Sequence, residues 1–232
     1  MILNRELNIT EGEVLLVRKP KGWTSFDVVS RIRGTFQVAK VGHAGTLDPM
    51  ATGLLIVCTG RKTKEIGQFV GLEKEYEVQM ILGARTSSFD SETPIIEQHT
   101  TDDITEEMVR SVLQDFVGSQ VQVPPMWSAA KVGGKRLYKY ARKGLEVERR
   151  PREVLVDSIT VSRIFLPEVH FTIVCSKGTY VRTLVDEAGK RLGCGAYVTA
   201  LERVRLGEFH LADALSIEDL ARLAMKKSHQ GL

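Results

Sequence analysis

One acidic side chain, Asp48, lies in a short segment whose composition would suit an acid that meets a ligand. Residues 41–55 read VGHAGTLDPMATGLL and contain three glycines. Glycine permits backbone angles and close approaches that a side chain forbids, and Pro49 biases Asp48 away from helical geometry. A carboxylate fixed on such a loop can act as a nucleophile or as a general base. The plainer alternative is an ordinary turn, in which Asp48 supports only the turn geometry.

Strands are predicted on both sides of this segment and again in the second half of the chain, at residues 14–17, 53–58, 75–82, 152–164 and 169–175. Residues 53–58 are almost entirely apolar, which favours a central strand. In residues 75–82 apolar and polar side chains alternate, which puts Tyr76 on the inward-facing side. Its ring is therefore either an ordinary part of the core or a surface on which a ligand can stack.

Four helices are predicted from their capping residues and apolar spacing. The caps and apolar stripes are Thr24 with Phe26, Val29, Ile32 and Phe36; Thr105 with Met108, Val112, Leu113 and Phe116; and Thr179 with Leu184, Val185, Ala188 and Leu192. Ser216 begins a final short helix that is expected to end near Met225. Because helices and strands do not alternate regularly, we expect an α+β fold around one large, mostly antiparallel sheet.

The bulk composition is that of an ordinary globular protein with a slight basic excess. Of 232 residues, 43% are hydrophobic and 26% are charged, and the formal net charge is +3. Basic residues concentrate in 131–152, which is either a solvated helix face or a contact surface for a polyanion. The three cysteines form no metal-ligand pattern, and no apolar run approaches the roughly 20 residues that span a membrane. With no signal-peptide layout either, we expect a cytoplasmic protein without a metal site.

Five segments, in the same order, resemble the motifs of one enzyme family. They are KPKGWTS at 19–25, AGTLDP at 44–49, KEY at 74–76 followed by LGART at 82–86 and Asp90, PPMWSAAKVGGKRLY at 124–138 and KGTYVRTL at 177–184. Together they span most of the chain and are similar to the bacterial tRNA pseudouridine-55 synthases, the TruB family. The resemblance implies the pseudouridine synthase fold, a large, mostly antiparallel mixed sheet flanked by helices, with the active-site cleft across the sheet.

The resemblance also implies an activity, the isomerisation of uridine to pseudouridine at position 55 in the T-loop of tRNA. The glycosidic bond breaks, the base rotates, and C5 of the base bonds to the sugar. Because nothing is oxidised and no group is transferred, we expect neither a metal nor an organic cofactor. The base must leave the folded RNA, so base flipping is expected. Asp48 is then the catalytic residue, and the sequence leaves open whether it attacks the ribose or the base.

Three substrate-binding residues carry over from the family to this chain. Tyr76 is implied to stack on the flipped base, and Leu201 to make an apolar contact with it. His43 is implied to fill or prop the gap that the flipped nucleotide leaves. Taken alone, His43 would more simply be a hydrogen-bonding loop residue, and no second ligand stands at metal spacing from it.

Tyr180 and Arg182 complete the set of substrate-binding residues that the resemblance implies. They stand two positions apart at the start of a predicted helix, and such positions do not share a helix face. We therefore expect Tyr180 to lie just outside regular helical geometry, although it could also be an ordinary core aromatic. Arg182 is expected to pair with Asp48, because a guanidinium stays charged and would keep the carboxylate ionised.

RNA recognition is expected to involve basic residues outside the catalytic set, namely Lys19, Lys131, Lys135, Arg136 and Arg142. Residue 202 departs from the family, which usually has a basic pair after Leu201, whereas this chain has Glu202. We expect a catalytic domain over residues 1–210 with a basic flap at about 124–152, and a short C-terminal helix and tail at 211–232. Relatives often continue into a small RNA-binding (PUA) domain that we do not expect here, so recognition should fall chiefly on the T-arm of tRNA.

Two other functions remain open at this point. The first is a synthase that acts on a different RNA, and the second is a non-catalytic RNA-binding module. The close spacing of the motifs argues against the first. The combination of Asp48, Tyr76 and Arg182 argues against the second, because binding alone requires basic and stacking residues and no enclosed acid. We expect a monomer with tRNA as its partner, no membrane association and no obligate protein partner.

Overall fold

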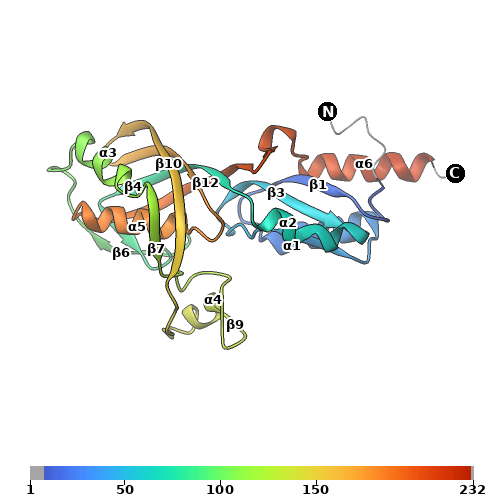
Figure 1. The fold of residues 1–232 in the computed structure, drawn as a ribbon, viewed down its shortest axis with the longest axis horizontal. Helices are drawn as coiled ribbons and strands as arrows, with labels where there is room; N and C mark the ends of the chain where they lie inside the picture. Colours follow the sequence, from blue (N-terminus) through green and yellow to red (C-terminus); the bar gives the residue numbers. More distant parts are fainter. Residues whose placement is uncertain (1–7, 231–232) are drawn as a thin grey trace. The chain divides into compact units, whose positions relative to one another are not determined.

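The chain divides into two compact units that interleave along the sequence. The computed structural model describes residues 8–230, with side chains as far as Met225. Unit 1 consists of the described parts of Met1–Lys74 and Glu202–Leu232, and unit 2 consists of Glu75–Leu201. Both ends of the described chain therefore belong to unit 1, and the middle of the chain forms unit 2 (Figure 1).

Nine strands of the described residues join in one mixed sheet. Along the sheet the order is β1 (Val14–Lys19), β3 (Thr52–Thr59), β12 (Ala196–Leu206), β4 (Lys74–Leu82), β11 (Glu168–Cys175), β10 (Arg152–Phe165) and β7 (Gly118–Gln122). In addition β2 (Val41–Ala44) pairs with β3, and β13 (Phe209–His210) pairs with β12. β12 runs parallel to β3, while β3 is antiparallel to β1 and β2, and β10 is antiparallel to β11 and β7. The expected α+β fold around a mostly antiparallel sheet is confirmed.

Unit 1 packs helices on a sheet whose central strand is buried on both faces. Its helices are α1 (Ser25–Phe36), α2 (Ile66–Val70) and α6 (Ile217–Gln230), with short 3₁₀ turns at Gly60–Glu65 and Leu211–Asp213. Leu55 and Val57 of β3 pack in one cluster with Val28 and Ile32 of α1 and with Leu220 of α6. The alternate residues Leu54, Ile56 and Cys58 pack in a second cluster with Leu206 and Leu211. Because successive strand residues face opposite sides, β3 is the central strand that its apolar run predicts.

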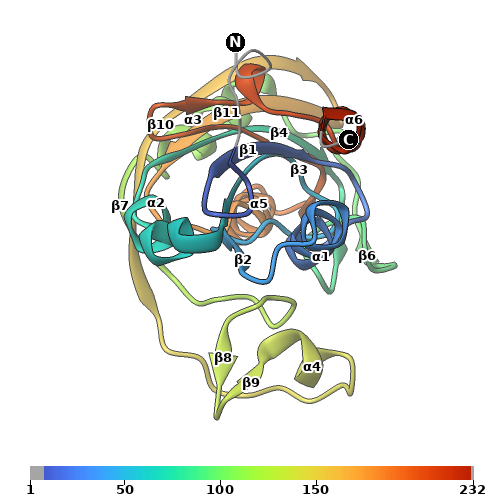
Figure 2. The same cartoon turned by 90° about the vertical axis from the view of Figure 1, so that its right-hand side faces the viewer.

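Unit 2 is built on the β10–β11 hairpin, with β7 along the outer side of β10. Its remaining elements are β5 (Ala84–Thr86), β6 (Ile95–Gln98), α3 (Glu106–Gln114), β8 (Lys131–Val132), β9 (Lys135–Arg136), α4 (Leu137–Ala141) and α5 (Val181–Arg191). Helix α5 buries Leu184, Val185 and Ala188, as its spacing predicts. The segment that carries β8, β9 and α4 extends away from the rest of this unit (Figure 2).

The caps of the helices largely follow the sequence prediction. Thr24 and Asp27 form a reciprocal capping box at α1, and Thr105 caps α3. At α6 the Ser216 hydroxyl accepts from the Asp219 amide (3.0 Å), and the Ser216 amide and the Arg222 guanidinium lower the pKa of Asp219 to about 2. This helix runs to Gln230, beyond the predicted end near Met225.

The apolar stripes of α1 and α3 were predicted correctly at Val29, Ile32, Leu113 and Phe116, which are buried, but not at their first members. Phe26 is 60% exposed and Met108 is 42% exposed, so neither belongs to the core. Val28 and Val109 are fully buried in their place. Both errors lie in the first turn, where the large apolar side chain after the cap was taken for the start of the stripe. The direction in which the chain leaves the cap sets the buried face there, and spacing alone does not reveal it.

Among the described residues no helix is both long and apolar enough to cross a membrane.

Candidate active site

Asp48 lies on the connection between β2 and β3, two antiparallel strands that pair from Val41–Thr59 to Ala44–Ile56. Its side chain is half-buried, whereas the flanking residues Leu47 and Met50 are buried. The Asp48 carbonyl accepts a hydrogen bond from the Ala51 amide (3.1 Å), which closes a turn over Pro49. We name residues 45–53 the Asp48 loop. Its buried apolar side chains anchor it to unit 1 and leave the carboxylate at the surface of the turn.

Lys19 holds the residue that follows Asp48. Its ammonium donates to the carbonyls of Pro49 (3.2 Å), Trp23 (2.6 Å) and Pro20 (3.0 Å), and its side chain is fully buried. The Gly22 amide donates to the same Pro49 carbonyl (2.8 Å). This placement contradicts the expectation that Lys19 contacts an RNA backbone, because an ammonium buried on three carbonyls does not face a ligand. Two residues of the KPKGWTS motif, Lys19 and Gly22, instead hold the Asp48 loop by hydrogen bonds to the Pro49 carbonyl.

His43 lies on β2, five residues before Asp48, and pairs with Val57 of β3. Its side chain is half-buried. The histidine and the carboxylate therefore belong to the same strand and loop of unit 1. In the described residues no three His, Cys, Asp or Glu side chains group in a way that could hold a metal ion.

Arg182 lies in the first turn of α5 in unit 2 and is 2% exposed. Its guanidinium lies 3.4 Å from the Asp90 carboxylate and donates to the carbonyls of Ser88 and Trp127 (2.8 Å for Trp127). Asp90 is itself fully buried and accepts from the Ser88 hydroxyl and the Glu92 amide (2.9 Å). The guanidinium of Arg182 is therefore held in a fixed orientation by one carboxylate and two carbonyls of its own unit. Its expected pairing with Asp48 stays a prediction.

Tyr180 is the N-cap of α5, with extended backbone angles (φ −100°, ψ 99°). This confirms that it lies outside the regular helix, and it moves the predicted cap from Thr179 to the next residue. The Gln122 side chain accepts from the Tyr180 amide (2.9 Å) and donates to the Tyr180 carbonyl (3.4 Å). The backbone of Tyr180 is thus bound on both sides by the end of β7.

Tyr76 and Leu201 lie on the neighbouring strands β4 and β12 of the sheet. Tyr76 is 8% exposed and Leu201 is 7% exposed. The alternation predicted for β4 is confirmed, because Tyr76, Val78, Met80 and Leu82 are all buried. Such burial fits a core residue as well as a residue at the floor of a substrate site, so their roles toward a base stay predictions.

Comparison with known proteins shows the family to which this chain belongs. Residues 33–181 match the TruB family pseudouridylate synthase N-terminal domain, and residues 182–231 match the tRNA pseudouridylate synthase B C-terminal domain. The chain belongs to the TruB family of pseudouridylate synthases. It is 48% identical to a tRNA pseudouridine synthase B of Phocaeicola vulgatus over 91% of this chain and 93% of the relative. It is also 47% identical to one of Chlorobium luteolum, over 95% and 80% respectively.

Solved structures agree with this family assignment at the level of the fold. The chain is similar to an archaeal box H/ACA sRNP Nop10–Cbf5 complex, with a TM-score of 0.72 and 26% identity. An H/ACA RNP bound to a substrate RNA containing 2′-deoxyuridine gives a TM-score of 0.72 and 26% identity. The two matches include 99% and 97% of this chain, respectively. They include only 59% and 56% of the solved chains.

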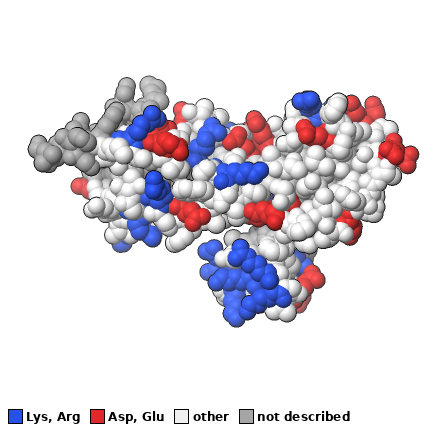
Figure 3. All heavy atoms as spheres, turned by 180° about the vertical axis from the view of Figure 1, so that it is seen from behind, with Lys and Arg blue, Asp and Glu red and all other residues white. Residues whose placement is uncertain are grey.

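The basic flap of this TruB family member is a small substructure of unit 2. We define the flap as residues 124–152. β8 and β9 form a hairpin with Lys131 opposite Arg136, and α4 buries Leu137 beneath it. Lys and Arg gather over the projecting segment that holds β9 and α4 (Figure 3). The exposed basic residues of the flap are Lys131, Lys135, Arg136, Lys139, Arg142, Lys143, Arg150 and Arg152.

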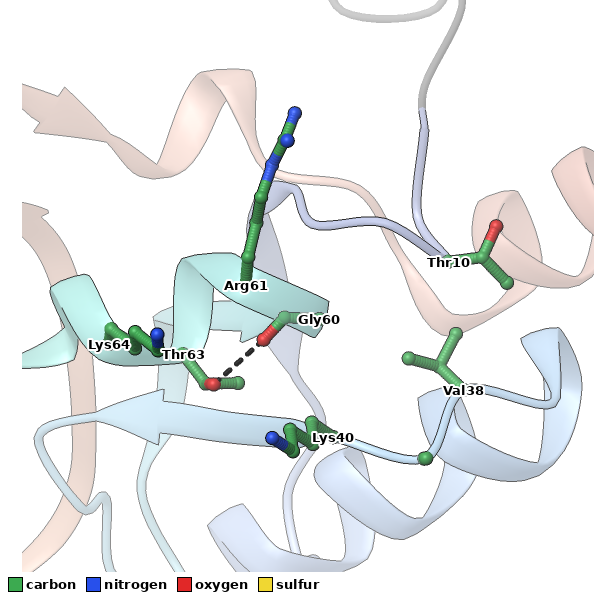
Figure 4. A pocket seen from close by; sticks show the side chains of 8 residues that line it. Thr10, Val38, Lys40, Gly60, Arg61, Thr63 and Lys64 are labelled. Carbon is green, nitrogen blue, oxygen red and sulfur yellow. Dashed lines mark hydrogen bonds between the residues drawn. The ribbon is translucent and has the colours of Figure 1, made fainter.

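A second basic surface, which we did not predict from the sequence, lines a pocket of about 370 Å³ in unit 1. Lys40 precedes β2, and Lys64 lies in the 3₁₀ turn after β3; both are exposed. Thr63 donates to the Gly60 carbonyl (2.8 Å) at the floor of the pocket, and Arg61 points away from Lys40 (Figure 4). The two lysines stand 24 positions apart, so no sequence pattern could have brought them together.

Proposed function

We propose that this chain converts uridine to pseudouridine at position 55 in the T-loop of tRNA, with Asp48 as the catalytic residue. The observation that carries this proposal is the family match together with the geometry of the Asp48 loop. Relatives of nearly equal length and 44–48% identity are named tRNA pseudouridine synthase B. In this chain the aspartate of the family motif is the single acid of its loop, and the residues on either side of it, Leu47 and Pro49, are held by hydrogen bonds.

Each of the other residues of the proposed site has a different role toward the substrate. Tyr76 offers an aromatic face and Leu201 an apolar contact for the flipped base. Tyr180, whose backbone is fixed by Gln122, would close the site beside Arg182. His43 would occupy the space that the nucleotide vacates. The reaction only breaks and re-forms bonds between one base and one sugar, so these side chains need no cofactor to carry it out.

Two basic surfaces would bind the phosphates of the RNA. The flap presents eight exposed cations on a small hairpin-and-helix substructure, which favours RNA contact over the alternative of a solvated helix face. Lys40 and Lys64 add exposed cations in unit 1, three residues before His43 and in the turn after β3. Contacts of this kind position an RNA without reading its sequence. We replace Lys19 by these two lysines among the candidates for RNA-backbone contact.

The decisive experiment measures tritium release from C5 of uridine in an unmodified tRNA transcript, followed by mapping of pseudouridine by carbodiimide derivatisation. One modified site at position 55 is expected, and a transcript with cytidine at that position should release no tritium. Modification at other positions, or activity only on other RNAs, would favour the alternative of a synthase with a different substrate. Absence of any pseudouridine, with RNA binding intact, would favour the non-catalytic alternative.

The T-arm is proposed to be the principal part of the tRNA that this chain recognises. The proposed reaction occurs in the T-loop, and the roles proposed for the site residues all concern a single flipped base. A T-arm hairpin should therefore compete well with full-length tRNA when kcat/KM is measured for both at one salt concentration. A hairpin that falls several orders of magnitude behind would show that contacts outside the T-arm are required.

A further inference from the structure

We propose that Arg203 and Ser25 are positioning residues that fix the shape of the Asp48 loop from behind. The inference rests on the proposed function, because it concerns the same loop, and it assigns roles that the motifs do not suggest. Arg203 is the second residue after Leu201, where the family usually has a basic pair, so the resemblance would suggest that it contacts RNA. The structure places it in the interior of unit 1.

Arg203 joins the two ends of the loop. Its Nη2 donates to the carbonyl of Gly45 (3.1 Å), three residues before Asp48, and its Nε donates to the carbonyl of Leu54 (2.7 Å), six residues after it. The side chain is 1% exposed, so both hydrogen bonds are shielded from water. Because the guanidinium is planar and rigid, the two donors set the separation of these carbonyls, which lie at either end of the loop.

The two glycines at the ends of the loop are required for different reasons, and Arg203 explains Gly53. Gly53 has a φ of +102°, and a Cβ there would lie 2.4 Å from the carbonyl oxygen of Arg203. Gly45 has a φ of +80°, and a Cβ there would lie 3.4 Å from Arg203 Nη1. These glycines permit the backbone angles of the loop ends and, at Gly53, the close approach of β12 that brings Arg203 into place.

Ser25 holds the middle of the loop. Its hydroxyl accepts from the Leu47 amide (2.9 Å) and donates to the Leu47 carbonyl (3.3 Å). Ser25 is 2% exposed and is the first residue of α1, directly after the Thr24 cap. Both polar groups of the residue before Asp48 are therefore bound by one side chain. Lys19 binds the Pro49 carbonyl on the other side, so the backbone is held immediately before and after the carboxylate.

A guanidinium is a costly group to bury for this purpose alone. The hydrogen bonds described for Arg203 all go to uncharged carbonyls, and no carboxylate of the described residues lies within salt-bridge distance of it. Burial of a charge without a counter-ion opposes folding. A group that opposes stability yet holds a catalytic loop fits a role in positioning, because a misplacement of about 1 Å can cost about 100-fold in rate.

The test compares Ser25→Ala, Arg203→Lys and Arg203→Met with the matched control Arg205→Met. Arg205 lies two residues further along β12 and pairs with Glu73 at 2.7 Å, outside the loop. For each variant the single-turnover rate on tRNA, the Kd for tRNA and the Tm are measured. We expect the rate to fall at least about tenfold in the first three variants, with Kd within about twofold of wild type. Arg203→Lys should not restore the rate, because an ammonium on a flexible stem does not fix the separation of the two carbonyls as the rigid planar guanidinium does. The control should keep its rate.

Three outcomes would overturn the proposal. The first is a wild-type rate in folded Ser25→Ala, which loses two hydrogen bonds and is expected to have a lower Tm. The second is a wild-type rate in folded Arg203→Met. The third is a loss of rate that Arg205→Met shares equally. A wild-type protein that makes no pseudouridine would instead refute the proposed function, so the two failures are distinguishable.

Discussion

Asp48, Tyr76 and Arg182 are three residues whose side-chain types suggest catalytic chemistry, and they differ in burial and in hydrogen-bond partners. Asp48 is half-buried on an anchored loop, Tyr76 is buried on a strand, and Arg182 is locked by a buried carboxylate and two carbonyls. The three residues thus differ in their exposure and in the groups that hold them.

Asp48→Asn tests the chemistry at the smallest possible change. The amide keeps the shape of the side chain but cannot serve as nucleophile or base at neutral pH. Pseudouridine formation should fall to background in the tritium-release assay, while the Kd for tRNA and the Tm stay close to those of wild type. Measurable turnover by a fully sequenced preparation of this variant would remove Asp48 from the mechanism.

Tyr76 offers two variants that distinguish stacking from proton transfer. If only the ring matters, Tyr76→Phe should bind tRNA normally and Tyr76→Leu should lose about 1–3 kcal/mol of binding free energy, the range for stacking of a base on an aromatic ring. If the hydroxyl transfers a proton, Tyr76→Phe should bind well but turn over slowly. Equal binding and equal turnover in both variants would make Tyr76 an ordinary core residue.

Asp90→Asn tests whether the buried ion pair between Asp90 and Arg182 contributes to stability. The amide oxygen can still accept from Ser88 and Glu92, but the buried guanidinium loses the charge of the Asp90 carboxylate. Removal of one partner from a buried ion pair costs about 3–5 kcal/mol, so the free energy of unfolding in urea should fall by an amount of this order. Asp103→Asn, an exposed change in the same unit, should alter it by less than about 0.5 kcal/mol. Similar values for the two variants would show that Asp90 does not hold Arg182.

At the scale of elements, the flap is the segment that is most basic and least integrated into the core of its unit. Its hairpin and helix bury one side chain fully, Leu137, and expose most of their cations. The Tyr138 ring lies 5.3 Å from the Arg142 guanidinium, so local contacts order the flap surface. A surface of this kind fits a polyanion whose position is set by charge.

Loss of flap cations should change the salt dependence of tRNA binding. For Lys135→Ala, the slope of log K against log salt should become shallower by about one unit, because one phosphate contact and its counterion release are lost. The double variant with Arg136→Ala should lose about two units. Arg163→Ala, an exposed cation on β10 of the same unit, serves as the control. An unchanged slope in the double variant would remove the flap from RNA binding.

At the scale of the whole molecule, the sequence predicted the elements much better than the connections between them. Alternation in β4, the apolar run of β3 and the caps at Thr24, Thr105 and Ser216 are local patterns, and the structure confirms them. In α1 and α3 the spacing predicted the buried face except at the first turn, where Phe26 and Met108 are exposed, because the side chains that pack against the start of a helix select its buried face there. The pairs Arg203–Gly45, Asp90–Arg182 and Gln122–Tyr180 join residues 158, 92 and 58 positions apart, and no local pattern contains that information.

The close approach of Gly53 to β12 also limits how this sequence can drift over evolutionary time. The atoms that a Cβ would strike first are backbone atoms of Arg203. No exchange of side chain at position 203 can therefore create the missing space, so a substitution at Gly53 has no compensatory partner there. Gly34, within α1, has open space around it, and lineages can exchange it freely for alanine. The two glycines look alike in the sequence, yet Gly34 can be replaced by alanine without a clash and Gly53 cannot.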